Sequence, residues 1–381
     1  MAKLGEVCIQ ITDGSHNPPS GVEQSEYLML SSKNIDDDFI TLDSPRFLSH
    51  SDYIAENNRT TVCEGDLLMT IVGTIGRVAI VPKELNGICL QRSVAVIKPE
   101  REIVNNRYLM YQLQNMRPFL EKEARGVAQK GIYLKQVSQL DIKLPELEQQ
   151  KQIVKVLDKV TELISLRKQQ LTKLDKLVKA RFVEMFGDPV KNTMDWEIKS
   201  LSELGELNRG VSKARPRNSP ELLGGPYPLI QTGEVANAKT YITSFNSTYS
   251  EKGLAQSKMW PKGTLCITIA ANIAQTSILT FDACFPDSVV GFISRNMTNE
   301  LFIHYWFSFF QKILDEQAPQ VAQKNINLKI LSELNVIVPP LSLQNRFAAF
   351  VERVDQQKQT VQQSLEKLEL MKKALMQEYF G

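Results

Sequence analysis

The chain has 381 residues, of which 43% are hydrophobic and 23% charged, and its formal net charge is +2. These values are ordinary for a globular protein, and the length corresponds to two or three domains. A net charge this small excludes binding of nucleic acid through bulk positive charge, so any such binding would depend on local basic patches. The apolar run Phe302–Phe310 is too short to cross a bilayer and contains His304.

Cysteine usage and the first residues predict a cytoplasmic protein. The five cysteines are odd in number and scattered, and Met1–Val7 lack the apolar core of a signal peptide. The histidines and cysteines never approach the spacing of metal ligands, and no phosphate-binding loop of the G-x-x-x-x-G-K-[ST] type is present. The adjacent acids Asp36–Asp38 are expected to form a solvated loop.

The segment Asn17-Pro18-Pro19-Ser20 is the strongest candidate for catalysis. Adenine methyltransferases use Asn-Pro-Pro followed by an aromatic residue that stacks on the flipped base. Here Ser20 stands in place of the aromatic residue, and no glycine-rich loop that would bind S-adenosylmethionine follows a predicted strand. We therefore expect a loop that turns at the prolines and a chain without catalytic residues.

The first half of the chain is predicted to mix short strands with a helix. Its elements are a hairpin of Asp66–Ile71 and Arg77–Val81 around Gly73-Thr74, a strand over Ser93–Ile97, a helix over Asn106–Glu123 with a break near Pro118, and a strand over Leu140–Leu144.

The second half repeats this order. Its elements are strands over Thr264–Ile269 and Ser288–Ile293, a helix over Glu300–Glu316 and a strand over Leu334–Val338. The segment Ala322–Phe347 matches Ala128–Ile153 without a gap at an offset of 194 residues, with eleven identical positions. The chain therefore contains two copies of one large unit, which predicts pseudo-twofold symmetry.

A long helix follows each mixed segment. Apolar residues recur at 4-3 spacing over residues 148–185 and again 194 residues later, which predicts coiled-coil helices. The seam residues are Ile153, Leu157, Val160, Ile164, Leu171, Leu174 and Val178, then Phe347, Val351, Val354, Val361, Leu365, Leu368 and Leu375. Neither apolar stripe is stable alone in water, so we expect the two helices to pair in antiparallel orientation. Homodimerisation through one helix is the alternative.

These elements predict an α+β fold with a pseudo-twofold internal repeat. Two mixed α/β domains, residues 1–145 and 188–340, are expected to be separated by the long antiparallel helices, residues 146–187 and 341–381.

Several motifs, in this order and duplicated, resemble one family. They are Ile11–Pro19 in an early loop, Gly65–Met69 with Gly76–Ala79 in a hairpin, Leu144-Pro145 with Gln149–Ile153 and Val338–Leu341 with Gln344 at the helix starts, and Phe186–Pro189 at a helix end. Together they resemble the specificity subunit of a type I restriction-modification system. Two departures are a missing acidic residue before Gln344 and the absence of any extra conserved terminal segment beyond the two units.

The resemblance implies two target-recognition domains, each reading one half of a split DNA site. It implies that the helices space these domains and dock two adenine methyltransferase subunits, and that restriction subunits with motor and nuclease activity join them. No cofactor is expected in this chain; S-adenosylmethionine belongs to the partner methyltransferase, and ATP and Mg to the partner restriction subunit.

Candidate DNA-contacting residues lie in the loops between the predicted strands. Bases are distinguished by paired donors and acceptors, whereas phosphates need cations, hydroxyls or backbone amides. In the second unit a basic loop without acids supplies Asn208, Arg209, Ser212, Lys213, Arg215 and Arg217. Its counterpart in the first unit supplies Thr12, Ser15, His16 and Asn17. A solvated basic loop and an ordinary surface histidine are the respective alternatives.

Further candidates flank the hairpins. Gln91 and Arg92 precede a strand of the first unit where Pro286-Asp287 stands in the second, so the frame is shared and the tips differ. Thr74 and Arg77 are candidates for phosphate contact, with Asn272 as their counterpart. The shared Lys130 and Lys324, with Lys135 and Lys329, indicate a task independent of base sequence: contact with phosphate or with the partner methyltransferase. Support of the following strand is the alternative.

The sequence as a whole favours a non-catalytic reader of double-stranded DNA with two unlike half-sites and an unread spacer set by helix length. The alternative is a coiled-coil scaffold that gathers protein partners without reading DNA. A stand-alone methyltransferase would have to bind S-adenosylmethionine by itself.

Overall fold

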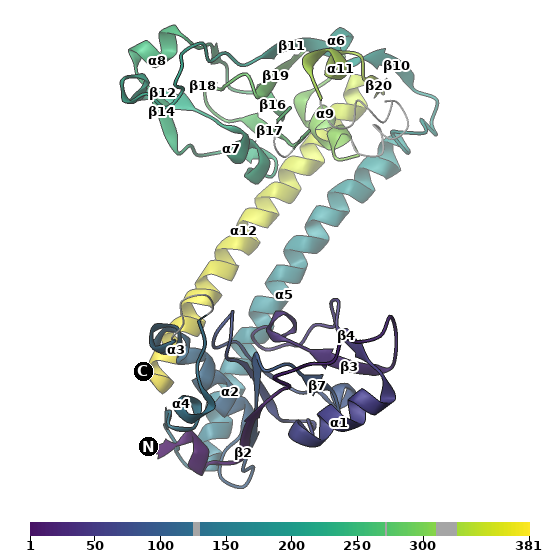
Figure 1. Ribbon diagram of the computed structural model, residues 1–381. Coiled ribbons are helices and arrows are strands. Elements are labelled where there is room, and N and C mark those ends of the chain that lie inside the picture. Colours follow the sequence, from purple (N-terminus) through teal and green to yellow (C-terminus); the bar gives the residue numbers. More distant parts are fainter. Residues whose placement is uncertain (125–129, 271–272, 310–325) are drawn as a thin grey trace. The chain divides into compact units, whose positions relative to one another are not determined.

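The computed structural model describes residues 1–124, 130–270, 273–309 and 326–381 (Figure 1). The chain forms two compact units. Unit 1 consists of Met1–Lys168 with Gln363–Gly381, and unit 2 of Gln169–Gln362. Within the described ranges, the search for a helix long and apolar enough to span a membrane found none.

Unit 1 contains two main sheets. Its elements are β1 (Ala2–Lys3), β2 (Cys8–Asp13), β3 (Tyr27–Leu30), β4 (Arg46–Leu48), α1 (His50–Thr60), β5 (Leu67–Thr70), β6 (Val78–Ile80), β7 (Cys89–Leu90), β8 (Val94–Pro99), α2 (Asn106–Asn115), α3 (Arg117–Glu123), α4 (Leu134–Ser138) and β9 (Asp141–Ile142). The sheet orders are β2-β8-β5-β6 and β4-β3-β7, and β1 pairs with β9. The residues of β5 are all buried and those of β8 nearly so, which explains their continuous apolar runs.

Unit 2 repeats this plan with additions. Its elements are β10 (Glu197–Ser200), α6 (Leu201–Leu204), β11 (Gly205–Arg209), β12 (Leu223–Leu229), α7 (Thr232–Asn237), β13 (Tyr241–Ile242), β14 (Ser247–Tyr249), α8 (Glu251–Ala255), β15 (Met259–Trp260), β16 (Leu265–Thr268), β17 (Thr276–Leu279), β18 (Ala283–Cys284), β19 (Val289–Ser294), α9 (Glu300–Phe307), α11 (Leu328–Ser332) and β20 (Asn335–Val338). The sheet orders are β11-β19-β16-β17-β13 and β14-β12-β18-β15, and β10 pairs with β20.

The two hairpins show how closely the units match. In unit 1 the backbone amide of Arg77 donates to the Thr70 hydroxyl at 3.0 Å, and in unit 2 Gln275 donates to Thr268 at 3.0 Å. Gly76 has a φ of 79°, and Ala274 takes the same left-handed conformation with a φ of 59°. The α+β fold with an internal repeat is thereby confirmed.

The break predicted near Pro118 is confirmed, whereas two other predicted elements differ in length. The helix predicted over Asn106–Glu123 divides at Met116 into α2 and α3, because Pro118 can only occupy the first turn of a new helix. The strand predicted over Leu140–Leu144 is reduced to β9, which pairs only with the two residues of β1. Where a helix is predicted over Glu300–Glu316, α9 ends at Phe307, a turn follows at Ser308 and Phe309, and residues 310–316 lie outside the described residues.

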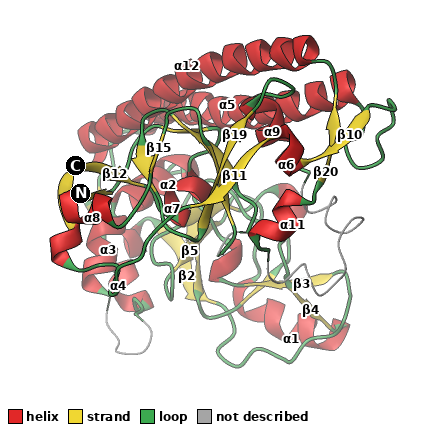
Figure 2. Cartoon of the chain, turned by 90° about the horizontal axis from the view of Figure 1, so that it is seen from above, coloured by secondary structure: helices red, strands yellow, loops and turns green. Residues whose placement is uncertain are grey.

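Two helices of 40 residues carry the coiled-coil pattern: α5 (Leu147–Phe186) and α12 (Leu341–Phe380). In unit 1 the guanidinium of Arg167 donates to Ser364 Oγ at 3.2 Å. In unit 2 the rings of Phe182 and Phe347 pack with centroids 5.4 Å apart. Residue numbers rise along α5 as they fall along α12, so the helices pair in antiparallel orientation within each unit (Figures 1 and 2).

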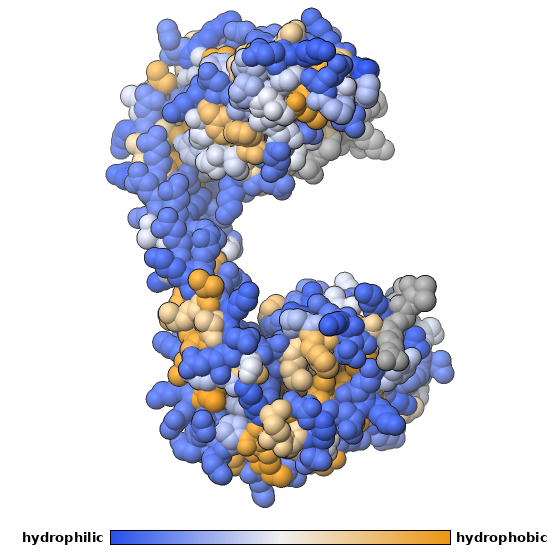
Figure 3. All heavy atoms as spheres, turned by 90° about the vertical axis from the view of Figure 1, so that its left-hand side faces the viewer, coloured by the Kyte–Doolittle hydropathy of each residue, from blue (hydrophilic) through white to orange (hydrophobic). Residues whose placement is uncertain are grey.

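The predicted seam lies inside this pairing. Of its fourteen residues, Leu171, Leu174, Leu368 and Leu375 are half-buried and the other ten are buried. The face over the middle of the helices that Figure 3 shows is largely hydrophilic, as expected when the apolar stripe faces the neighbouring helix. Each unit therefore includes helical segments from both halves of the chain.

One buried side chain anchors each long helix to its unit. Gln150 in the first turn of α5 donates to Pro145 O at 2.8 Å and accepts from the amide of Asn105 at 2.8 Å. Its repeat partner Gln344 donates to Pro339 O at 2.8 Å and accepts from the amide of Asn299 at 3.2 Å. Both glutamines are 0% exposed, so without these hydrogen bonds their own amide groups would be buried without a partner.

Candidate nucleic-acid interface

In each unit a glycine brings two loops together at one edge of a sheet. A Cβ on Gly14 would lie 2.1 Å from Leu90 O, and a Cβ on Gly210 would lie 2.2 Å from Phe285 O. Only glycine permits this approach. It places the loop after β2 against the turn before β8, and the loop after β11 against the turn before β19. The candidate DNA-contacting loops are thus paired in the same way in both units.

The basic loop of unit 2 holds cations in two different states. Arg209 and Lys213 are exposed and have no ion-pair partner within the described part of the chain. Arg215 folds onto its own loop, where Nη1 donates to Ser212 O and Ala214 O, each at 2.7 Å. Arg217 Nη2 donates to both oxygens of Asp287, at 2.6 and 2.9 Å.

Two other candidates of this loop are less available than expected. Ser212 is only 7% exposed, so little of this residue is available for contact. The Asn208 side chain is half-buried and donates to Glu206 Oε1 at 2.7 Å. The sequence shows no acid within the loop; Asp287 pairs with Arg217 from a turn that lies far away in the sequence.

The counterpart loop of unit 1 is organised around Asp13, which is 7% exposed. Asp13 binds His16 Nε2 at 2.9 Å and Arg59 Nη2 at 2.7 Å. His16 and Asn17 are exposed, whereas Ser15 is buried and its hydroxyl donates to Glu56 at 3.0 Å. Thr12 is half-buried in β2, opposite Val96. Arg59 was not a sequence candidate, and its proximity to the loop depends on tertiary structure alone.

The turn before β8 presents Arg92 where unit 2 presents Asp287. The neighbouring serines establish the match: Ser93 O accepts from Ile71 at 2.9 Å, and Ser288 O accepts from Ile269 at 3.0 Å. Arg92 is exposed and no ion pair engages it among the described residues, while Gln91 is half-buried. The two units thus place opposite charges at one point of a common frame.

The hairpin of unit 1 is less basic than the sequence indicates. Arg77 Nη1 lies 2.7 Å from Asp36, Arg117 binds Asp37, and Lys372 Nζ lies 3.5 Å from Asp38. The three acids lie in a loop as predicted, but they are half-buried and each pairs with a cation from a different element.

Of the other candidates around the hairpins, two are exposed and two lie outside the described residues. Thr74 is exposed near the hairpin turn, and its carbonyl accepts from the Thr70 hydroxyl. Lys130 is exposed, and its carbonyl accepts from the Gly73 amide at 3.4 Å, which places it beside the hairpin. Asn272 and Lys324 lie outside the described residues.

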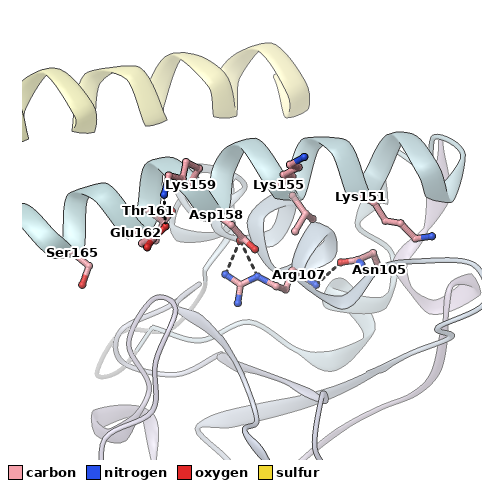
Figure 4. Close-up of a pocket in the computed structure, with 10 residues that line it drawn as sticks. Asn105, Arg107, Lys151, Lys155, Asp158, Lys159, Thr161, Glu162 and Ser165 are labelled. Atoms are coloured by element: carbon pink, nitrogen blue, oxygen red, sulfur yellow. Dashed lines mark hydrogen bonds and ion pairs between the residues drawn. The ribbon is translucent and has the colours of Figure 1, made fainter.

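A groove of about 700 Å³ lies along α5 in unit 1 (Figure 4). Arg107 donates from Nε to Asp158 at 2.8 Å, and Lys159 binds Glu162 at 2.9 Å. The Arg107–Asp158 pair ties α2 to α5, whereas Lys159 and Glu162 pair within α5. A search of the described residues for three or more His, Cys, Asp or Glu side chains able to hold one metal ion found none.

One histidine in unit 2 has a strongly shifted pKa. Burial, reinforced by the nearby Lys358, lowers the pKa of His304 to about 4, so the ring is neutral at pH 7. Its Nδ1 lies 2.9 Å from Thr276 Oγ1. His304 belongs to the packing of α9 against β17 rather than to the candidate interface.

Comparisons with known proteins agree with this architecture. Residues 29–176 and 193–370 each match the type I restriction modification DNA specificity domain. A putative type I restriction enzyme specificity subunit, MjaX, of Methanocaldococcus jannaschii is 24% identical over 331 residues, which cover 82% of this chain and 76% of that protein.

Two solved structures share the fold. A chain from a structure concerned with complex assembly and conformational transition of the type I R-M system has a TM-score of 0.59 at 17% identity, with 100% of this chain and 96% of that chain covered. The type I restriction-modification S subunit from M. genitalium has a TM-score of 0.56 at 13% identity, with 100% and 95% covered. With two copies of the family's domain on one duplicated scaffold, the chain belongs to the type I restriction-modification DNA specificity family.

Proposed function

We propose that this chain reads an asymmetric, two-part DNA site and thereby directs adenine methylation and DNA cleavage by partner subunits. The observation that carries the proposal is a common scaffold with different tips. In unit 1 the loop after β2 contacts the turn before β8, and in unit 2 the loop after β11 contacts the turn before β19. A glycine permits the close approach in each unit. The side chains displayed there differ between the units, as two unlike half-sites require.

The chemistry of the tips supports DNA contact. Unit 1 presents His16, Asn17 and Arg92, and unit 2 presents Arg209, Lys213 and Arg217. An arginine fork fits the O6 and N7 acceptors of guanine, and an asparagine amide fits adenine, so these sets favour different base sequences. The remaining cations would contact phosphates and contribute affinity that does not depend on sequence.

The proposal assigns all catalysis to partners. Two methyltransferase subunits would bind S-adenosylmethionine and modify adenine, and restriction subunits would use ATP and Mg for translocation and cleavage. The present chain would contribute recognition and geometry but no catalytic group. We place the assembly in the cytoplasm, where it meets both host and invading DNA.

Genome-wide mapping of methylated adenines tests the proposal. The chain and its cognate methyltransferase would be expressed together in a host without DNA methylation of its own, and modified adenines located by single-molecule sequencing. A two-part motif that disappears when the chain is omitted is the expected result. Methylation that is unaffected by its omission, or a stable complex that methylates nothing, would favour a scaffold without DNA readout.

Duplex binding by the complex separates the two functions independently. Contact with phosphates makes affinity fall steeply with salt concentration. A scaffold that only gathers proteins would show no such dependence.

A further inference from the structure

One carboxylate outside the basic loop of unit 2 fixes the position of an arginine inside it. Asp287 lies in the turn between β18 and β19, and it receives two hydrogen bonds from Arg217 Nη2, at 2.6 and 2.9 Å. Arg215 is more distant, with Nη2 3.9 Å from Asp287. The side chains of Arg217 and Asp287 are 44% and 42% exposed. An ion pair this exposed contributes little to folding, so stability does not explain its presence.

The pairing leaves much of the Arg217 guanidinium available. Arginine has five N–H donors, and Asp287 engages only the nitrogen Nη2. The described residues offer no other hydrogen-bond partner to this side chain, so Nη1 and Nε can still donate. An arginine held in this way loses less conformational freedom on binding than a free one. Nη1 and Nε point in different directions, so each can donate singly to a base acceptor such as O6 or N7 of a guanine.

The neighbouring arginine has a different task. Both hydrogen bonds of Arg215 Nη1 go to carbonyls of its own loop, Ser212 O and Ala214 O. These bonds brace the loop backbone against which Arg217 is positioned. The structure thus distinguishes a bracing arginine from one that is held with donors to spare.

The acid is a property of unit 2 and not of the shared scaffold. The matching place in unit 1 holds Arg92, in a turn closed by an equivalent backbone bond, Val94 N to Gln91 O at 3.0 Å, where unit 2 has Val289 N to Pro286 O at 3.0 Å. A carboxylate beside a DNA-binding loop repels phosphates and therefore lowers affinity for every sequence. If such a carboxylate also orients a side chain that reads a base, it lowers affinity for all sequences but increases the difference in affinity between the correct site and other sites.

We infer that Asp287 is a specificity-determining positioning residue that holds Arg217 for recognition of a guanine in the second half-site. This inference rests on the proposed function of the chain as a reader of two half-sites. Substitution Asp287→Asn removes the charge but keeps the size of the side chain, so Arg217 would become mobile. Preference for guanine at one position of the second half-site should then fall by about tenfold or more.

The experiment uses the complete complex with its methyltransferase. Methylation rates are measured on duplexes that carry the mapped site, and on duplexes with each single base-pair substitution in either half-site. Asp287→Glu should restore most of the preference. Arg217→Lys keeps the charge without the planar guanidinium that can bind Asp287 and a base at once, and it should lose the preference as Asp287→Asn does. Glu221→Gln is the matched control, because it removes one exposed acid that pairs with Lys252 in the same unit.

The expected result is a loss of discrimination confined to one position of the second half-site, with first-half-site discrimination and the thermal midpoint unchanged. The salt dependence of binding should become steeper by about one counterion, because Arg217 is released toward phosphate. Unchanged discrimination in Asp287→Asn, equal loss in both half-sites, or a second half-site without any G·C pair would overturn the inference. Failure of the proposed function is recognised separately, because the wild-type complex would then show no two-part site.

Discussion

At the residue scale, the cations of the unit 2 loop differ in how they are held. Arg209 ends β11, is exposed and lacks an ion-pair partner among the described residues, whereas Arg217 is bound by Asp287. A mobile, exposed cation suits phosphate, which attracts charge from many directions. A guanidinium held in one orientation suits a base edge, because a base acceptor must be approached from a particular direction.

Arg209→Ala is therefore expected to weaken binding of the complex to all DNA sequences alike. Removal of one phosphate contact should reduce the slope of log affinity against log salt concentration by about 1. Titrations of a fluorescent duplex at several salt concentrations measure this slope. Lys252→Ala, which removes an exposed cation elsewhere in unit 2, should leave it unchanged. A change in base preference without a change in slope would show that Arg209 reads a base instead.

A second residue-scale effect concerns stability. The pKa of His304 is lowered by burial to about 4, whereas in the unfolded chain it returns to about 6.5. The unfolded state therefore binds more protons between these values. The contribution of the neutral His304 to the free energy of unfolding is fully present above pH 6.5 and is lost as the pH falls toward 4. Unit 1 has Met110 and Val78 at the places of His304 and Thr276.

The double variant His304→Met with Thr276→Val should consequently lose less stability than wild type on acidification. We expect the difference between pH 7 and pH 5 to be about 1 to 2 kcal/mol. Urea unfolding followed by tryptophan fluorescence measures it, because all three tryptophans, Trp196, Trp260 and Trp306, belong to unit 2. Equal acid sensitivity of variant and wild type would exclude His304 as the source.

At the scale of elements, the joint between each domain and its long helix is the best-matched feature of the repeat. Gln150 and Gln344 occupy the first turns of α5 and α12, and each satisfies the backbone beside the capping asparagine of a neighbouring helix, Asn105 or Asn299. The identity of these residues across the repeat thus has a structural cause. It does not require contact with DNA.

Gln344→Ala should destabilise unit 2 by about 2 kcal/mol or more. The substitution leaves the hydroxyl of the buried Thr298 and the carbonyl of the buried Pro339 without their present partner, and buried unsatisfied groups cost about 1 to 3 kcal/mol each. Tryptophan fluorescence during urea unfolding reports the change. The exposed neighbour Ser342→Ala serves as the control. A midpoint as high as that of the control would mean that water replaces the glutamine without cost.

Periodicity and turn residues made most of these elements predictable, but they did not predict which side chains from distant elements pair with one another. The heptad pattern predicts α5 and α12, and Pro118 predicts the break between α2 and α3, because these signals are local. The composition of the basic loop was equally visible. The pairing of its Arg217 with Asp287 was not, because the acid is brought near by sheet pairing.

The same limit explains the remaining differences at the site. Ser15 is buried against Glu56, and Asp13 gathers His16 and Arg59, through contacts that link β2 to α1. One signal was available but unused. The offset of 194 residues extends from the matched helix starts back to Asn105 and Asn299, which identifies the helix caps.

At the scale of the whole molecule, duplication makes each unit depend on both halves of the chain. The core of unit 1 includes Met376 and Phe380 from the end of α12, and that of unit 2 includes Phe182 and Phe186 from the end of α5. Each helix thus belongs to both units, so a change in its length affects both of them. If the chain reads two half-sites, helix length should set the spacer between them.

Deletion of one heptad from both helices, residues 165–171 and 359–365, tests this idea. The deletion keeps the seam in phase and removes the bonded pair Arg167 and Ser364 together. Each helix becomes shorter by about 10 Å, so the spacer should shorten, by at most about three base pairs, while both half-sites stay the same. Mapping of methylated adenines gives the new motif directly. The single deletion of residues 165–171 misaligns the seam and should abolish methylation, whereas an altered half-site in the double deletion would refute the role of helix length.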